Sequence, residues 1–238
     1  MILYLTSSPT GTFTRWDEKE FDGFNPANDF AKNLAADLLG IGSKVRCLMI
    51  AASPDAYEMN DRMCQEMKER LVCEEYLIEC MDVCDNRSCN LSDELGNYTF
   101  IILGGGHVPT QNAFFKHIKL KEKLKSFSGI VMGISAGSMN CADIVYAQPE
   151  EEGESTDPGY ERFISGLGLT DLQVIPHYNV TKDFMLDGKR VFEDITYPDS
   201  MGRKFYILTD GSYIRCTEKE NEFCGEIYVL SDGKMTRK

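Results

Sequence analysis

A serine set between two glycines is the feature of this chain best suited to do chemistry. The apolar residues 129–132 lead into a Gly-x-Ser-x-Gly motif at 133–137, with Ser135 at its centre. A strand that ends in this motif is typical of a nucleophile elbow, in which a sharp turn exposes the hydroxyl and a helix follows. Glycines suit the turn because the backbones come too close for a Cβ atom. The motif also arises by chance, so the nucleophile needs a base, an acid and an oxyanion hole elsewhere in the chain.

The base must come from three histidines, because a serine hydroxyl alone is a weak nucleophile. His177 follows a short apolar run, at the carboxyl end of a predicted strand, where open α/β sheets place their sites. We expect His177 to be the base; the alternative is a structural histidine in a turn. His117 lies in a basic stretch and is expected on a helix surface. His107 follows another strand and is a candidate for substrate binding.

Three consecutive glycines, at 104–106, follow the apolar run 101–103. They lack the spacing of a dinucleotide-binding motif and the lysine of a P-loop. Backbone amides without a neighbouring Cβ can approach a carbonyl oxygen closely, so we expect Gly105 and Gly106 to form an oxyanion hole together with Ala136. A simple tight turn is the alternative.

The acid that orients the base is expected to be Asp210, which ends a predicted strand and precedes Gly211. An Asp-Gly hairpin turn is the alternative for this pair. A carboxylate within 150–157 is the competing third member. The order Ser135, His177, Asp210 differs from the Ser, acid, His order of α/β-hydrolases.

Short apolar runs alternate with longer amphipathic ones, which predicts an α/β fold: a three-layer sandwich around a mostly parallel sheet. Expected strands cover residues 1–7, 44–51, 76–81, 98–103 and 129–133, and expected helices cover 26–39, 56–73, 110–126 and 136–141. Residues 148–159 form an acidic stretch rich in turn residues, which predicts an exposed loop. Beyond it we expect a strand at 172–176, a helix at 181–195 and short antiparallel strands at 204–209, 212–216 and 226–230. We expect one domain over residues 1–238.

The composition of the chain limits the kinds of partner that it can bind and the compartment in which it is expected. The net charge of −13 argues against a nucleic-acid or anionic membrane surface, and no apolar run approaches the ~20 residues of a spanning helix. The nine cysteines are expected to be free thiols in a reducing compartment, and the start of the chain resembles a strand more than a signal peptide. A cytoplasmic location is therefore expected. The spacing of Cys80, Cys84 and Cys89 does not match a zinc finger, so we expect no metal.

Together these motifs resemble the peptidase E family of serine peptidases, which includes aspartyl dipeptidases and is related to cyanophycinases. The resemblance rests on the glycines at 104–106, on Gly-Ile-Ser-Ala-Gly at 133–137, on Pro-His-Tyr-Asn at 176–179 and on Asp210-Gly211. It implies a fold like that of class I glutamine amidotransferases (flavodoxin-like), and a Ser–His–acid mechanism that removes N-terminal aspartate from short peptides.

Two positions depart from the family pattern. Family members often carry asparagine after the glycines, whereas this chain has His107. Family aspartyl dipeptidases hold the substrate carboxylate with an arginine downstream of the histidine. Arg190 is the candidate here, with a solvated helix charge as the alternative.

The sequence thus predicts a serine exopeptidase or dipeptidase that forms an acyl-enzyme, uses no cofactor and acts on a short peptide substrate. A second copy of the chain, in a homodimer, is left open. The competing hypotheses are a catalytically silent member that acts as a binding or sensor protein, and an amidase that acts on a small amide.

Overall fold

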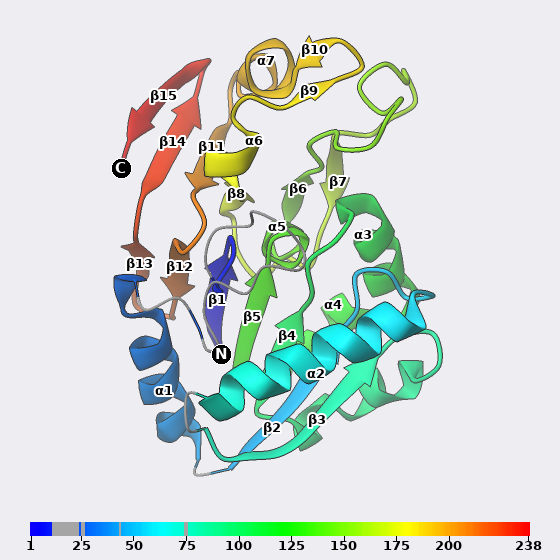
Figure 1. Ribbon diagram of the computed structural model, residues 1–238, viewed down its shortest axis with the longest axis vertical. Helices are drawn as coiled ribbons and strands as arrows, with labels where there is room; N and C mark the ends of the chain where they lie inside the picture. Colours follow the sequence, from blue (N-terminus) through cyan, green and yellow to red (C-terminus); the bar gives the residue numbers. More distant parts are fainter. Residues whose placement is uncertain (11–23, 25–26, 43, 74–75) are drawn as a thin grey trace.

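A seven-stranded sheet forms the centre of the computed structural model, which describes residues 1–10, 24, 27–42, 44–73 and 76–238, without the side chains of Ala27 and Cys73 (Figure 1). Its strand order is β13-β12-β1-β5-β4-β2-β3. The strands are β1 (Ile2–Thr6), β2 (Val45–Ile50), β3 (Ile78–Cys84), β4 (Phe100–Leu103), β5 (Ile130–Ile134), β12 (Tyr213–Cys216) and β13 (Asn221–Cys224).

Five neighbouring strands of this sheet, from β1 to β3, run parallel to one another. The other two strands of this sheet are antiparallel to their neighbours. β12 pairs with β1, and β13 pairs with β12. The predicted α/β fold with a large, mostly parallel sheet is therefore confirmed. The layering of a class I glutamine amidotransferase and the single domain remain predictions.

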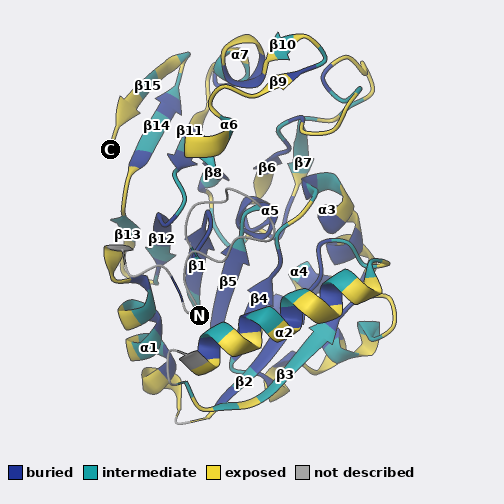
Figure 2. Cartoon of the chain, viewed as in Figure 1, coloured by how far each residue is buried: buried dark blue, intermediate teal, exposed yellow. Residues whose placement is uncertain are grey.

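Helices cover both faces of the sheet, and the strand pleat explains the division. In β4, Phe100 and Ile102 pack into a cluster with α1 and α2, whereas Ile101 and Leu103 pack into another with α3, α4 and α5. Figure 2 shows the central strands largely buried and the outer side of α2 exposed. The helices are α1 (Phe30–Ile41), α2 (Tyr57–Cys73), α3 (Val108–His117), α4 (Leu120–Leu124), α5 (Ala136–Asn140), α6 (Tyr178–Thr181) and α7 (Tyr197–Asp199), with 3₁₀ segments at Ala27–Asp29 and Cys89–Asn97 and a π-helical turn at Val191–Thr196.

A second sheet, of order β15-β14-β11-β8, lies beside the first (Figure 1). Its strands are β8 (Gln173–Ile175), β11 (Lys204–Leu208), β14 (Ile227–Ser231) and β15 (Lys234–Arg237). β8 and β11 are parallel, and the other pairs are antiparallel. The strand expected at 212–216 joins the main sheet as β12, so the predicted C-terminal strands are divided between two sheets.

The prediction of a helix at 181–195 is wrong. This stretch contains the end of α6, the hairpin β9 (Met185–Leu186) and β10 (Lys189–Arg190), and most of the π-helical turn. Asp187 and Gly188 both have positive φ, at 52° and 78°, which a hairpin turn accepts and a helix does not. The helix expected at 110–126 is divided into α3 and α4, with Lys119 at φ 54° between them. The helix expected from Pro26 begins at Phe30, and Pro26 itself lies outside the described residues.

The acidic loop lies between β6 (Ile144–Tyr146) and β7 (Phe163–Ser165) and is mostly exposed, as predicted. All eight cysteines whose side chains are described are free. Among the helices built from described residues, none has the length and apolar character to cross a membrane.

Candidate active site

Ser135 stands at the junction of β5 and α5, in a backbone conformation that few non-glycine residues adopt. Its φ is 52° and its ψ is −113°. A Cβ on Gly137 would lie 2.2 Å from the carbonyl oxygen of Leu103, and one on Gly133 would lie 2.5 Å from the amide of Ser138. The two glycines are needed for the close approach that the motif predicted. The strained turn between a strand and a helix agrees with the geometry that the motif predicts.

Strand register brings the polar residues together from two sheets. In the main sheet Thr6 pairs with Ile134, so the residues that follow, Ser7 and Ser135, leave neighbouring strand ends. In the second sheet Ile175 pairs with Ile207, so His177 and Asp210 also follow adjacent strand ends. Carboxyl ends of parallel strands meet at one edge, which is why four residues distant in sequence converge.

The convergence gives a continuous set of hydrogen bonds. His177 Nε2 lies 2.8 Å from Ser135 Oγ, and His177 Nδ1 lies 2.6 Å from Asp210 Oδ1. The Asp210 side chain is completely buried and that of His177 is 20% exposed. Serine, imidazole and carboxylate therefore stand in the order and spacing of a nucleophile, a base and an orienting acid. Among the hydrogen bonds and ion pairs between described residues, none joins a carboxylate of 150–157 to His177.

Two further residues, Ser7 and Asn179, to which the sequence motifs assign no role, hold this set in place. Ser7 Oγ donates to Asp210 Oδ1 at 2.7 Å and accepts from the backbone N–H of His177 at 2.8 Å. Asn179 donates from its side chain to Asp210 Oδ2 at 3.3 Å and accepts from the Asp210 amide at 2.9 Å. Ser7 follows a strand end as His177 does, so the same positional rule could have identified it.

The glycine turn after β4 lies against the turn that carries Ser135. A Cβ on Gly105 would sit 3.5 Å from Ser135 Cβ. The carbonyl of Gly104 accepts a hydrogen bond from the Gln111 side chain, which fixes the start of the turn. In the described part of the chain, the amides of Gly105, Gly106 and Ala136 donate to no recorded acceptor.

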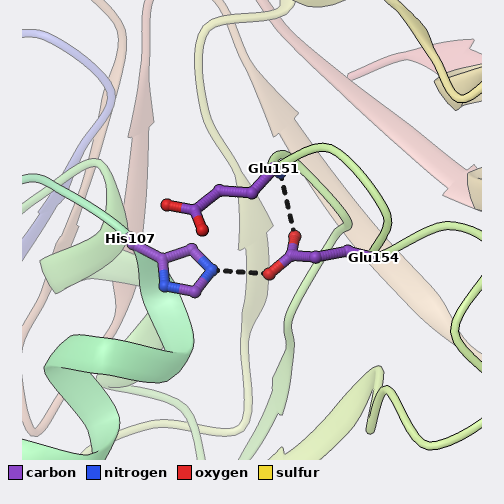
Figure 3. Close-up of side chains that lie close together, drawn as sticks. All are labelled: His107, Glu151 and Glu154. Atoms are coloured by element: carbon purple, nitrogen blue, oxygen red, sulfur yellow. Dashed lines mark hydrogen bonds and ion pairs between the residues drawn. The ribbon is translucent and has the colours of Figure 1, made fainter.

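The two candidates for substrate binding have partners of their own. His107 occupies the N-cap position of α3, and its ring contacts Glu154 (Figure 3). The other ring nitrogen lies 2.7 Å from Thr110 Oγ1. Arg190 is exposed and forms a two-point ion pair with Asp194, four residues along, which favours the alternative of a solvated charge. In the part of the chain that the structure describes, no hydrogen bond or ion pair joins either residue to Ser135, His177 or Asp210.

Fold and site together define an α/β protein with a serine, histidine and aspartate at the edge where two sheets meet. The model of peptidase family S51 matches residues 28–223. The chain belongs to peptidase family S51, and this membership supports peptidase activity.

Solved structures share the fold at low sequence identity. A peptidase from an acI-B1 Actinobacterium aligns with a TM-score of 0.63 and 17% identity, over 100% of this chain and 93% of its own. A protein from Listeria monocytogenes EGD-e, provisionally described as a peptidase E, aligns with a TM-score of 0.60 and 18% identity, over 93% of this chain and 96% of its own. No curated protein sequence matches the chain.

Proposed function

We propose that this chain is a serine exopeptidase that cleaves short peptides, with Asp-X dipeptides as the first substrates to test. The observation that carries the proposal is the 2.8 Å contact between Ser135 Oγ and His177 Nε2, continued by the 2.6 Å contact to Asp210. The preference for aspartate rests on the family resemblance alone.

In the proposed acylation step, Ser135 Oγ attacks the scissile carbonyl carbon while His177 Nε2 accepts the hydroxyl proton. The buried Asp210 carboxylate accepts from Nδ1–H, which holds the imidazole in the tautomer with a free Nε2 and stabilises the imidazolium. When the C–N bond breaks, His177 returns the proton to the leaving amine, and the acyl group stays on Ser135.

Water completes the proposed cycle. His177 takes a proton from a water molecule, the hydroxide oxygen attacks the ester carbonyl, and the proton passes to Ser135 Oγ as the acid product leaves. Both tetrahedral intermediates carry a negative oxygen. The amides of Gly105, Gly106 and Ala136, which donate to no acceptor among the described residues, are the proposed donors to that oxygen. Loss of one such donor typically costs about 10²–10³ in rate.

Replacement of the nucleophile tests the proposal. Ser135→Ala is expected to abolish turnover of Asp-X dipeptides and of an aspartyl anilide, while the melting temperature stays close to that of the wild type. Ser128→Ala is the matched control, because Ser128 is an exposed serine in the loop before β5. A fluorophosphonate probe should label the wild type and Ser128→Ala but not Ser135→Ala. If the folded wild type is neither labelled nor active on any dipeptide, the catalytically silent alternative is the correct one.

A further inference from the structure

A second group of polar side chains gathers beside the glycine turn. The ligand atoms of His107, Glu151 and Glu154 all lie within 4.8 Å of one another. Figure 3 shows both carboxylates beside the same imidazole, with His107 coming from the start of α3 and the glutamates from the acidic loop. The hydrolytic mechanism proposed for Ser135 uses none of the three.

The contacts around this group resemble those that orient metal ligands. His107 Nδ1 lies 2.7 Å from Thr110 Oγ1, which fixes the ring and directs Nε2 toward Glu154 Oε1, 2.8 Å away. The other oxygen of Glu154 accepts hydrogen bonds from the backbone N–H groups of Glu150 and Glu151, at 2.9 and 3.0 Å. Metal-bound histidines and carboxylates usually carry such outer hydrogen bonds.

Local charge and an unfilled hydroxyl point the same way. In the described part of the chain, no lysine or arginine forms an ion pair with Glu150, Glu151 or Glu154. The buried hydroxyl of Tyr160, close to the same carboxylates, has no hydrogen-bond partner among the described residues. The group is therefore rich in negative charge, and the Tyr160 hydroxyl beside it is available for a hydrogen bond.

We propose that His107, Glu151 and Glu154 bind a divalent transition-metal ion. One imidazole and two carboxylates suit Mn²⁺, Co²⁺ or Zn²⁺ better than Ca²⁺ or Mg²⁺, which prefer oxygen alone. Ligands about 2.1 Å from a shared ion lie roughly 3.0–3.5 Å apart, so the side chains need only small shifts. Three protein ligands leave positions open for water, and the exposed Glu151 gives access from solvent.

The bound ion would tie the acidic loop to the residue that follows Gly105 and Gly106. Its role is therefore to order the loop and the turn, and the binding does not depend on the hydrolytic role of Ser135.

Mn²⁺ binding to the full chain, stripped with a chelator, tests the proposal. Mn²⁺ is chosen because thiolates bind it poorly, so the free cysteines should not contribute to the measured binding. Electron paramagnetic resonance of free Mn²⁺ should show one saturable site per chain, and Zn²⁺ should displace the ion. His107→Asn should remove this site. Glu151→Gln should weaken it at least tenfold, and Glu152→Gln, a neighbouring glutamate outside the group, should bind as the wild type does.

Glu151→Gln keeps the test decisive, because this side chain is exposed and forms no hydrogen bond with another described residue whose loss could unfold the loop. Near-ultraviolet circular dichroism checks its fold. The proposal is overturned if the wild type has no saturable Mn²⁺ site, or if Glu151→Gln binds Mn²⁺ as tightly as the wild type. It is also overturned if Glu151→Gln loses turnover of peptides with a free amine while its Mn²⁺ binding is unchanged, since the group would then hold a substrate ammonium.

Discussion

Ser7 offers a sharp test of the site, because its hydroxyl serves two members of the set at once. It donates to Asp210 at 2.7 Å and accepts from the His177 amide at 2.8 Å, and the residue is completely buried. Ser7→Ala removes both bonds but leaves Ser135, His177 and Asp210 unchanged. The carboxylate loses a donor, and the His177 amide loses its acceptor.

The expected size of the effect follows from these two bonds. A buried polar group left without a partner costs about 1–3 kcal/mol. If that cost falls on the position of the imidazole in the transition state, kcat decreases about 10- to 100-fold, since each 1.36 kcal/mol is worth about tenfold in rate. The free energy of unfolding should decrease by about 1–3 kcal/mol as well. KM should change little, because Ser7 acts through His177 and Asp210.

Steady-state kinetics on an aspartyl anilide and urea denaturation measure the two quantities. Ser8→Ala is the matched control, since Ser8 is also buried but, among the described residues, its hydroxyl contacts only Thr10, at 3.3 Å. The reasoning is refuted if Ser7→Ala keeps kcat within twofold of the wild type. It is also refuted if Ser8→Ala loses as much kcat as Ser7→Ala, because the loss would then come from packing near β1.

Two further predictions concern the acid and the elbow. Asp210→Asn should lower kcat by about 10⁴ with the fold retained, because an amide can favour the wrong imidazole tautomer; activity above one tenth of the wild type in the same anilide assay would assign the acid elsewhere. Gly137→Ala should lower the free energy of unfolding by about 3 kcal/mol or prevent folding, because the new Cβ would lie 2.2 Å from the Leu103 carbonyl oxygen. Gly96→Ala is its control in urea denaturation, since no atom lies within 4 Å of a Cβ there, and equal losses in the two variants would contradict the steric argument.

The parallel strands could be predicted because their apolar runs are buried on both faces. The β5 run at 130–134 is one example, and the β4 run at 100–103 is completely buried. The failure at 181–195 has a local cause. Valine, phenylalanine, methionine and leucine recur there at helix-like intervals, but the backbone reverses at Asp187 and Gly188. The pattern also could not show that β11 and β12, only four residues apart, enter different sheets, because that depends on tertiary pairing.

The three residues proposed for catalysis could be named from the sequence because each stands one or two residues after the end of a strand and within two residues of a glycine or a proline. Ser7 and Asn179 were missed because their importance lies in partners more than 30 positions away, Asp210 above all. The ion pair of Arg190 with Asp194 has i,i+4 spacing, so the predicted helix over 181–195 would itself have suggested it, although the segment is not a continuous helix. Positions of chemistry were thus easier to predict than the contacts that hold them.

The division of the site between two sheets has a consequence for how the molecule fails. Ser7 and Ser135 belong to the ends of β1 and β5, whereas His177 and Asp210 belong to the ends of β8 and β11. Every contact between these two pairs joins the main sheet to the second sheet. A displacement of one sheet by about 1 Å relative to the other would be enough to weaken catalysis severely. The proposed peptidase activity should therefore depend on how closely the two sheets keep their relative position. Under mild denaturation it should disappear while each sheet still keeps its own hydrogen bonds.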